Sequence, residues 1–171
     1  MANKLIKNKQ CTIVFYVDDL KISHRDEEVV INIIEELNKR FGDIMPLSVS
    51  RGKVHNYLNI TFDYTTKVKL IITMYDYIDG IIKNADQIYK DGSGSATPAS
   101  DHLYEIRDVD SEDYEPLSED ERKKYHTITA QCLYLSKRDR PDLQQLIAFN
   151  CTRVNNPTKD DQKKEIRTIK Y

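Results

Sequence analysis

The hydrophobic pattern changes its period along the chain, and this change constrains the fold more than any other feature. Before residue 75, short β-branched runs and alternating apolar and polar residues are typical of strands. After residue 118, apolar residues recur every three or four positions, which indicates helices. The expected strands are residues 11–17, 20–23, 55–64 and 67–74. The expected helices are one that opens after Ser23 and ends before Gly42, one over residues 75–89, and three that begin near residues 118, 141 and 157. The sequence therefore predicts an α+β fold, with an antiparallel ββαββα part followed by a helical part.

Local signals mark the starts of several expected helices. Ser23 with Asp26, and Ser118 with Glu121, have the spacing of a capping box, in which each residue satisfies a backbone N–H of the first turn. Pro157 is placed to open the last helix, which is expected to be still running at the final residue.

A Gly/Ser-rich segment at residues 91–98 separates the two parts and is the clearest linker in the chain. The predicted organisation is residues 1–90, a linker and acidic segment at residues 91–117, and a helical region at residues 118–171. With 171 residues, the chain has room for about one ordinary domain or slightly more.

The net charge of −2 hides a strong asymmetry. Residues 100–121 contain ten acidic residues and one basic residue, whereas residues 122–171 contain twelve basic and five acidic residues. Three interpretations are open: the basic half faces an anionic partner, the acidic segment folds back and screens it, or the charges belong to solvated helix faces.

Composition also excludes several classes of protein. The longest apolar runs, such as residues 70–72, are far too short to cross a bilayer, and no signal peptide is recognisable. Cys11, Cys132 and Cys151 are odd in number and lack the spacing of a zinc site, so neither a disulfide framework nor zinc is expected. We expect an intracellular chain, in a cytoplasmic particle or the nucleus, that is not secreted and has no membrane partner.

Asp18 and Asp19 are adjacent carboxylates that directly follow a strongly apolar strand. Aspartate is common in turns between strands, so the pair can be a simple turn. Two like charges at the end of a buried strand repel, however, unless a cation neutralises them, and paired carboxylates suit Mg²⁺. Both interpretations are open from the residues alone.

The residues around this pair carry a family resemblance. Residues 15–22, FYVDDLKI, resemble motif C of reverse transcriptases, the aspartate hairpin of the polymerase palm. Separated motifs in the same order are similar to copia-type LTR retrotransposon polymerases: residues 3–4 (NK), 10–12 (QCT), 17–24 (VDDLKISH), 51–58 (RGKVHNYL), 97–99 (TPA), 140–142 (RPD), 152–154 (TRV), Pro157 and residues 169–171 (IKY). The resemblance therefore extends over nearly the whole chain.

The resemblance implies an RNA-directed DNA polymerase that uses two Mg²⁺ ions, with RNA template, DNA primer and deoxynucleoside triphosphates as partners. Residues 1–90 would be the C-terminal half of the palm, and residues 118–171 a thumb or connection region. By position, Asp18 would be the catalytic ligand of both ions and Asp19 the second, less directly coordinating carboxylate. Tyr16 would lie under the nascent base pair.

Further site residues follow from the same resemblance. Tyr57, Leu58, Asn59 and Ile60 match the strand segment that grips the primer terminus, although the family more often has Gly where this chain has Asn59. Lys53 is a candidate for contacting pyrophosphate or donating a proton to it, and a surface lysine otherwise. The basic residues of the helical region would contact the template–primer backbone; they are Arg122, Lys123, Lys124, Lys137, Arg138, Arg140, Arg153, Lys163, Lys164, Arg167 and Lys170. Arg138 and Arg140 are the first of these to test.

The resemblance also indicates what the chain lacks. No acidic residue precedes Asp18, whereas the family's metal site needs an upstream palm aspartate. Fingers, the first half of the palm, the strands beside residues 12–17 and ribonuclease H are also expected to be missing. We therefore expect a polymerase fragment that is inactive alone. Two alternatives are a non-catalytic nucleic-acid-binding remnant that uses the basic helices, and a small interaction protein in which the aspartate pair is only a turn.

Overall fold

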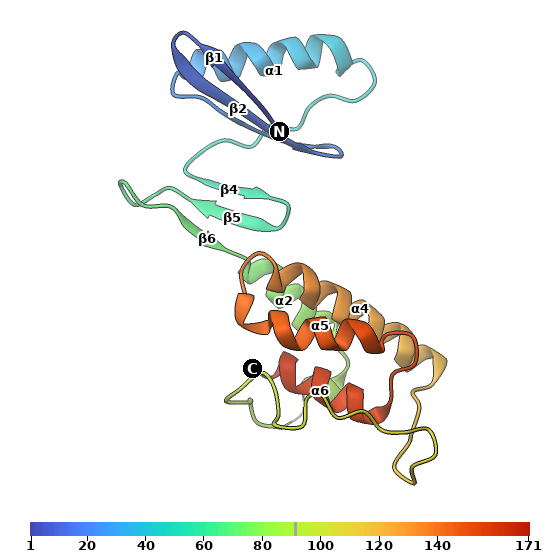
Figure 1. Cartoon of the computed structure of the whole chain (residues 1–171). Coiled ribbons are helices and arrows are strands. Elements are labelled where there is room, and N and C mark those ends of the chain that lie inside the picture. Colours follow the sequence, from blue (N-terminus) through green and yellow to red (C-terminus); the bar gives the residue numbers. More distant parts are fainter. Residues whose placement is uncertain (91) are drawn as a thin grey trace. The chain divides into compact units, whose positions relative to one another are not determined.

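The computed structural model describes residues 1–90 and 92–171, so Asp91, the first residue of the expected linker, lies outside the described residues. The chain divides into two compact units, Met1–Ile72 and Thr73–Tyr171 (Figure 1). It has two small antiparallel sheets and several helices, which confirms the α+β class. Within the described residues, no helix combines the length and apolarity that crossing a membrane requires.

The first sheet contains β1 (Ala2–Ile6), β2 (Lys9–Tyr16) and β3 (Asp19–Ser23), in that order. The expected hairpin around the aspartate pair is present as β2 and β3. The expectation that the strand over residues 12–17 lacks a neighbour on its other side is wrong for residues 12–13, because β1 pairs with Lys9–Ile13 through a two-residue turn at Lys7 and Asn8; residues 14–16 pair with β3 alone among the described strands. The open edge of this sheet next to the hairpin therefore belongs to β3.

Helix α1 (Glu27–Phe41) crosses one face of this sheet (Figure 1). Its N-cap is Asp26, whose carboxylate accepts from the Glu28 N–H at 3.0 Å. The expected capping box that begins at Ser23 is wrong, since Ser23 still pairs with Thr12 in the β-ladder. Gly42 ends the helix, where a Cβ would collide with the Asn38 carbonyl oxygen.

The second sheet contains β4 (Val54–Tyr57), β5 (Ile60–Asp63) and β6 (Ile71–Thr73). The sequence predicted a single strand over residues 55–64. This prediction is wrong, because the segment folds back on itself to form β4 and β5. The strand expected at residues 67–74 is reduced to its last part. Alternation alone cannot distinguish one long strand from a tight hairpin, because a two-residue turn keeps the period.

The second unit is helical and contains a short 3₁₀ helix, Pro141–Leu143. Its α-helices are α2 (Tyr75–Asn84), α3 (Gln87–Lys90), α4 (Glu119–Ser136), α5 (Gln144–Arg153) and α6 (Lys159–Ile169). The capping box of Ser118 and Glu121 is present at the start of α4. Two expectations are wrong: the helix over 75–89 is interrupted between α2 and α3, and α6 ends before the last residue, with Lys170 as its C-cap.

The two units differ in how much apolar surface they bury. The helical unit has a core, formed by Met74, Ile81, Tyr89, Leu103, Tyr125, Ile128, Cys132, Leu135, Leu143, Leu146 and Ile147. In the first unit, Cys11 and Val29 are the fully buried apolar side chains of the described residues, while Phe15, Leu20 and Tyr64 stay at least 43% exposed. The first unit therefore leaves much of its apolar surface uncovered by its own residues.

Candidate functional site

The aspartate pair lies at the tip of the β2–β3 hairpin. Val17 and Asp18 form its two-residue turn, and Tyr16 pairs with Asp19 across the closing step of the ladder. Val17 has a φ of 53°, a left-handed conformation that is costly for a β-branched residue, and its side chain is 88% exposed. Strain of this kind persists where the surrounding structure enforces it, and it clusters at functional sites.

A groove of about 890 Å³ begins at this tip, and we call it the edge groove. It is lined by residues 18–24, by residues of the segment 45–57, by Val30 and by Tyr64. The groove thus brings together four of the sequence-predicted site residues: Asp18, Asp19, Lys53 and Tyr57. Two carboxylates and a lysine in one hollow can hold a cation and the oxyanion of a ligand at neighbouring positions.

Lys21 also lines the edge groove, and sequence reasoning missed it. Its ammonium lies 4.6 Å from the ring centre of Phe62 and 5.7 Å from that of Tyr64, so the second sheet's rings partly enclose it. Burial lowers the pKa of Lys21 from its usual value, because the charged form loses water. Its position on the strand that follows the aspartate pair could have marked Lys21 as a site residue. The sequence gives no sign of its aromatic neighbours, because they come from a hairpin some forty residues later.

The predicted primer-gripping segment forms the tip of the β4–β5 hairpin. Tyr57 pairs with Ile60, and the turn residues Leu58 and Asn59 have φ values of 53° and 59°. Both values lie in the left-handed region, where Asn and Gly are tolerated and Leu is costly. Asn59 therefore meets the same backbone requirement as the glycine more common in the resembling family, and the segment is a turn, in contrast to the continuous strand expected.

Tyr57 has a further feature that bears on the groove. Its hydroxyl is buried, and it has no hydrogen-bond partner among the described residues. A buried hydroxyl without a partner costs about 1–3 kcal/mol relative to a satisfied one. A polar group of a ligand in the edge groove is one way to satisfy it.

Tyr16 lies at the end of β2, directly before the turn, and is 62% exposed. Phe15 and Leu20, which face each other across the ladder, are 56% and 44% exposed. The hairpin therefore presents aromatic and aliphatic surface beside its carboxylates, a combination that suits the face of a base next to a charged group.

The carboxylates of the hairpin do not by themselves provide the ligand set of a metal site. Within residues 1–90 and 92–171, no group of three or more His, Cys, Asp or Glu side chains is arranged to hold a metal ion. Asp18 and Asp19 supply the oxygen donors that Mg²⁺ prefers, but two carboxylates do not complete its coordination. The donor set fits a magnesium site in part, and further ligands would have to come from substrate or from another polypeptide segment.

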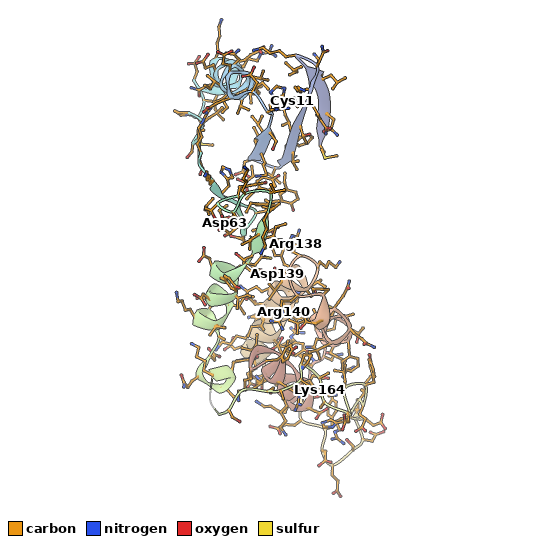
Figure 2. The ribbon with its side chains drawn as sticks, turned by 90° about the vertical axis from the view of Figure 1, so that its left-hand side faces the viewer. Cys11, Asp63, Arg138, Asp139, Arg140 and Lys164 are labelled. Carbon is orange, nitrogen blue, oxygen red and sulfur yellow. The ribbon has the colours of Figure 1, made fainter. Side chains whose placement is uncertain are left out.

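Arg138 and Arg140 follow the end of α4 in the second unit, with Asp139 between them (Figure 2). The Arg138 guanidinium lies 3.6 Å from the ring centre of Tyr134, and the Arg138 side chain is exposed. Arg140 donates to both carboxylate oxygens of Asp142, at 2.9 and 3.0 Å, so its charge is neutralised within the fold. The two arginines thus differ: Arg138 is available to an anionic partner, and Arg140 is held by an internal ion pair.

Other basic residues of the helices have structural contacts. Lys164 is 4% exposed, donates to the Glu105 carbonyl at 2.6 Å and pairs with Asp160 at 2.9 Å. Arg153 pairs with the buried Asp161 at 3.2 Å. Lys164 is thus buried against its own unit and Arg153 is held in an ion pair, so both charges are already balanced within the fold.

The segment between α3 and α4 folds back along α6. The Ser95 N–H donates to the Lys170 carbonyl at 2.9 Å, and Arg167 donates to the Thr97 hydroxyl at 2.8 Å. Arg107 of this segment pairs with Asp160 of α6 at 4.0 Å. In the described part of the chain, no ion pair joins a carboxylate of residues 101–115 to a basic side chain. Its acidic side chains thus remain available to solvent.

A buried carboxyl group in the second unit was also missed. Glu165 is fully buried and accepts from the hydroxyls of Tyr89 at 2.8 Å and Thr129 at 2.6 Å. Burial raises its pKa to about 8. Helix α6 has few apolar residues, so its sequence pattern gave no sign of this buried face.

Comparison of the chain with protein-family models, with curated proteins and with solved structures found no match.

Proposed function

We propose that this chain is part of a copia-type reverse transcriptase and supplies half of a nucleotidyl-transfer site. The observation that carries the proposal is the aspartate pair at the tip of a tight hairpin, opening into a groove that also contains Lys53 and Tyr57. The motif-C resemblance of residues 15–22 assigns this hairpin its chemistry, and the local geometry is compatible with that assignment.

In this proposal Asp18 and Asp19 hold Mg²⁺. When bound, Mg²⁺ would lower the charge on the triphosphate and favour ionisation of the primer hydroxyl. Lys53 would balance the charge of the leaving pyrophosphate, and the exposed ring of Tyr16 would support a base beside the carboxylates. The tip of the β4–β5 hairpin, residues 57–60, would position the primer end.

The proposed site is incomplete, so the chain alone is proposed to be inactive. Two carboxylates without a further protein ligand hold Mg²⁺ weakly. Activity would require a polypeptide segment that brings another carboxylate to the hairpin tip. The partners proposed for the complete enzyme are RNA template, DNA primer and deoxynucleoside triphosphates.

Metal binding by the hairpin can be tested on the chain as it is. Titration with Mn²⁺, whose unpaired electrons broaden nearby NMR signals, should broaden the amide signals of residues 17–20 first. Asp18→Asn should abolish this broadening, whereas Asp43→Asn, which removes a carboxylate from an exposed turn, should leave it unchanged. Equal broadening of the wild-type and Asp18→Asn hairpins would contradict the proposed metal site.

Polymerisation requires a second test in trans. The chain is mixed with a copia-type polypeptide that contains the fingers and first half of the palm, together with a primed RNA template and Mg²⁺. Primer extension that depends on this chain and is lost with Asp18→Asn would support the proposal. Absence of extension, with metal binding also absent, would overturn it.

A second candidate function is nucleic-acid binding without catalysis. The exposed Arg138 guanidinium on the Tyr134 ring favours it, because such a stack can extend to a base or a phosphate. This function predicts a salt-dependent affinity for single-stranded RNA that survives Asp18→Asn and falls with Arg138→Ala.

A further inference from the structure

Helix α6 is attached to the rest of the second unit through polar side chains. Five of its residues are buried, and each is polar or charged: Asp161, Gln162, Lys164, Glu165 and Thr168. Its two isoleucines, Ile166 and Ile169, are only half-buried. Burial of apolar surface is the main term that holds a helix to its neighbours, so α6 depends largely on hydrogen bonds and ion pairs.

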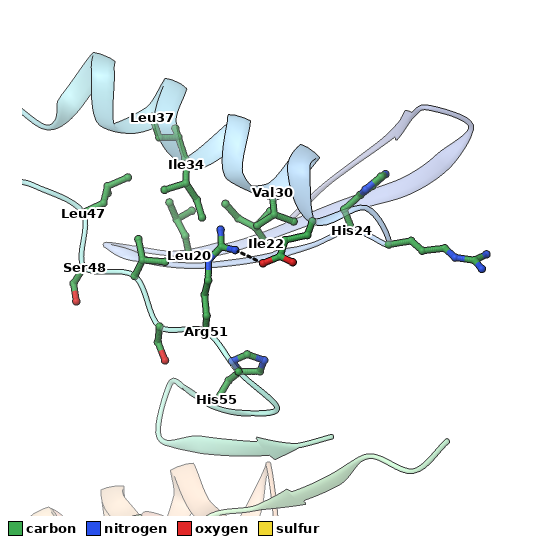
Figure 3. A pocket seen from close by; sticks show the side chains of 15 residues that line it. Leu20, Ile22, His24, Val30, Ile34, Leu37, Leu47, Ser48, Arg51 and His55 are labelled. Atoms are coloured by element: carbon green, nitrogen blue, oxygen red, sulfur yellow. Dashed lines mark hydrogen bonds and ion pairs between the residues drawn. The ribbon is translucent and has the colours of Figure 1, made fainter. Parts of the chain in front are cut away.

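Other helices of the chain pack through apolar side chains. In the first unit, Figure 3 shows Val30 of α1 directed toward Leu20 and Ile22 of β3. In the second unit, α5 buries Leu146 and Ile147, which both belong to the core. Helix α6 contacts α3, α4 and α5 (Figure 1) without contributing a buried apolar side chain to that core.

Glu165 is the contact through which α6 reaches two of these helices. Its carboxyl group accepts from the hydroxyl of Tyr89 on α3 at 2.8 Å and from the hydroxyl of Thr129 on α4 at 2.6 Å. The side chain is fully buried, and within residues 1–90 and 92–171 it takes part in no ion pair. The attachment of α6 therefore places a carboxyl group in the interior without a cation beside it.

The neighbouring groups do not balance an ionised Glu165. The titratable groups that face it from α3 and α4 stay neutral because burial raises the pKa of each; they are Tyr89, Tyr125 and Cys132. Arg153, the charged side chain of α5, is paired with the buried Asp161 at 3.2 Å. On α6 itself, Lys164 is paired with Asp160 at 2.9 Å. The charged form of Glu165 is therefore strongly disfavoured while α6 is docked, and water stabilises it once α6 is released.

We propose that α6 is a detachable helix, which leaves α3, α4 and α5 as one body when Glu165 loses its proton. Release lets water reach the carboxylate, and few apolar contacts of α6 oppose it. The inference rests on the contacts of α6 alone and is independent of the proposed nucleotidyl transfer.

The segment of residues 92–98 should move together with α6. The Ser95 N–H donates to the Lys170 carbonyl at 2.9 Å, directly after the end of the helix. Arg167 donates to the Thr97 hydroxyl at 2.8 Å. Because these bonds tie the segment to α6, the movable part consists of the helix and this segment.

Release of α6 should increase with pH. The docked helix keeps the Glu165 proton up to about pH 8, whereas the released helix loses it near pH 4.5. Between these values, the equilibrium constant for release should rise about tenfold per pH unit, because release is coupled to the loss of one proton. Above about pH 8 the constant should level off, since both forms are then ionised.

Amide hydrogen exchange of the full chain tests the release, followed by NMR from about pH 6 to about pH 9. Division of each rate by the intrinsic rate at the same pH gives the opening constant of that amide. The amides in the middle of α6 should share one constant, which exceeds that of the buried amides of α4 at every pH and rises about tenfold per unit up to pH 8. Equal constants in α6 and α4 would show that α6 leaves only when the whole unit unfolds, and would overturn the proposal.

A substitution tests the role of the carboxyl group. Glu165→Gln keeps the size of the side chain but cannot ionise, so the opening constant of α6 should become independent of pH. The matched control, Asp113→Asn, removes a carboxylate from the exposed acidic segment and should leave the pH dependence unchanged. A pH dependence that survives Glu165→Gln would refute the role of Glu165. The wild-type series needs no variant, so a flat wild-type series would overturn the proposal even if Glu165→Gln does not fold.

Discussion

Tyr89 donates its phenolic hydrogen to the Glu165 carboxyl group across 2.8 Å, and the two residues are 76 positions apart in the sequence. The hydroxyl of Thr129 bonds the other carboxyl oxygen, so this one acidic side chain connects three helices in the interior of the second unit. Cys132 and Tyr125 lie close enough for Glu165 to raise the pKa of each, in addition to the effect of burial.

Glu165 should make the stability of the helical unit fall with rising pH. Its pKa is about 8 in the folded chain and near 4.5 in a solvated one, so the folded state retains a proton that the unfolded state loses between these values. The stabilising contribution is complete below about pH 4.5 and is lost as the pH approaches 8, with a slope of at most about 1.4 kcal/mol per pH unit. Urea denaturation followed by helical circular dichroism measures it.

The titratable groups that surround Glu165 should not contribute to this pH dependence. Tyr89, Tyr125 and Cys132 stay neutral over this range because burial raises the pKa of each. Glu165→Gln keeps the shape without the charge and should flatten the pH dependence, whereas Glu112→Gln in the exposed acidic segment should not. A wild-type slope that survives Glu165→Gln would show that another group is responsible.

Removing one partner of the Arg153–Asp161 pair should destabilise the helical unit strongly. Asp161 is 2% exposed, bonds Arg153 and also accepts from the Thr158 backbone N–H at the start of α6. Arg153→Met leaves this carboxylate buried without its cation, for which we expect a loss of about 3–5 kcal/mol in the free energy of unfolding. The double variant Arg153→Met/Asp161→Asn should lose less than the sum of the single variants, and additive losses would contradict a direct coupling.

The turn of the β4–β5 hairpin should accept glycine and reject β-branched residues. Asn59 has a φ of 59°, so Asn59→Gly should change the stability of the hairpin by only a few tenths of a kcal/mol. Asn59→Val places a β-branched residue in the left-handed region and should cost about 1–2 kcal/mol. Hydrogen exchange at the amides of β4 and β5 reports both effects, and similar exchange in the two variants would contradict the turn geometry.

Lys159 should hold the pKa of Glu121 low. The Lys159 ammonium bonds this carboxylate, and the backbone and side chain of Ser118 donate to it as well, which together lower its pKa to about 2. The stabilisation is present above about pH 4.5 and is lost as the pH falls through about 2. Lys159→Met should raise the pKa of Glu121 toward its usual value in an NMR titration, while Lys163→Met on the same helix should not.

Local patterns predicted some elements correctly and missed others, such as the turn at residues 58–59 and the N-cap of α1. The β2–β3 hairpin and the Ser118–Glu121 capping box depend on residues a few positions apart, and both are present. Strand β1 escaped prediction because Asn3 and Lys4 interrupt its apolar pattern, and its stability comes from pairing with β2. Propensity carries little information about such edge strands.

The two carboxylates of the candidate site were predictable from the sequence, but the side chains that surround the site were not. Asp18 and Asp19 stand out in the sequence because they are adjacent and follow an apolar strand. The enclosure of Lys21 by Phe62 and the burial of Lys164 arise between segments distant in sequence. Single-sequence patterns specify the type of a residue but not which distant element will cover it.

The long separation between Tyr89 and Glu165 has a consequence for how the chain is made. The strands of the first sheet each pair with the next strand in sequence, so they can associate as soon as they leave the ribosome. The helical unit must wait for α6, the helix that carries Glu165, before Tyr89 meets its partner. Until α6 has been synthesised, the faces of α3, α4 and α5 that α6 covers remain exposed in the nascent chain, where chaperones recognise apolar surface.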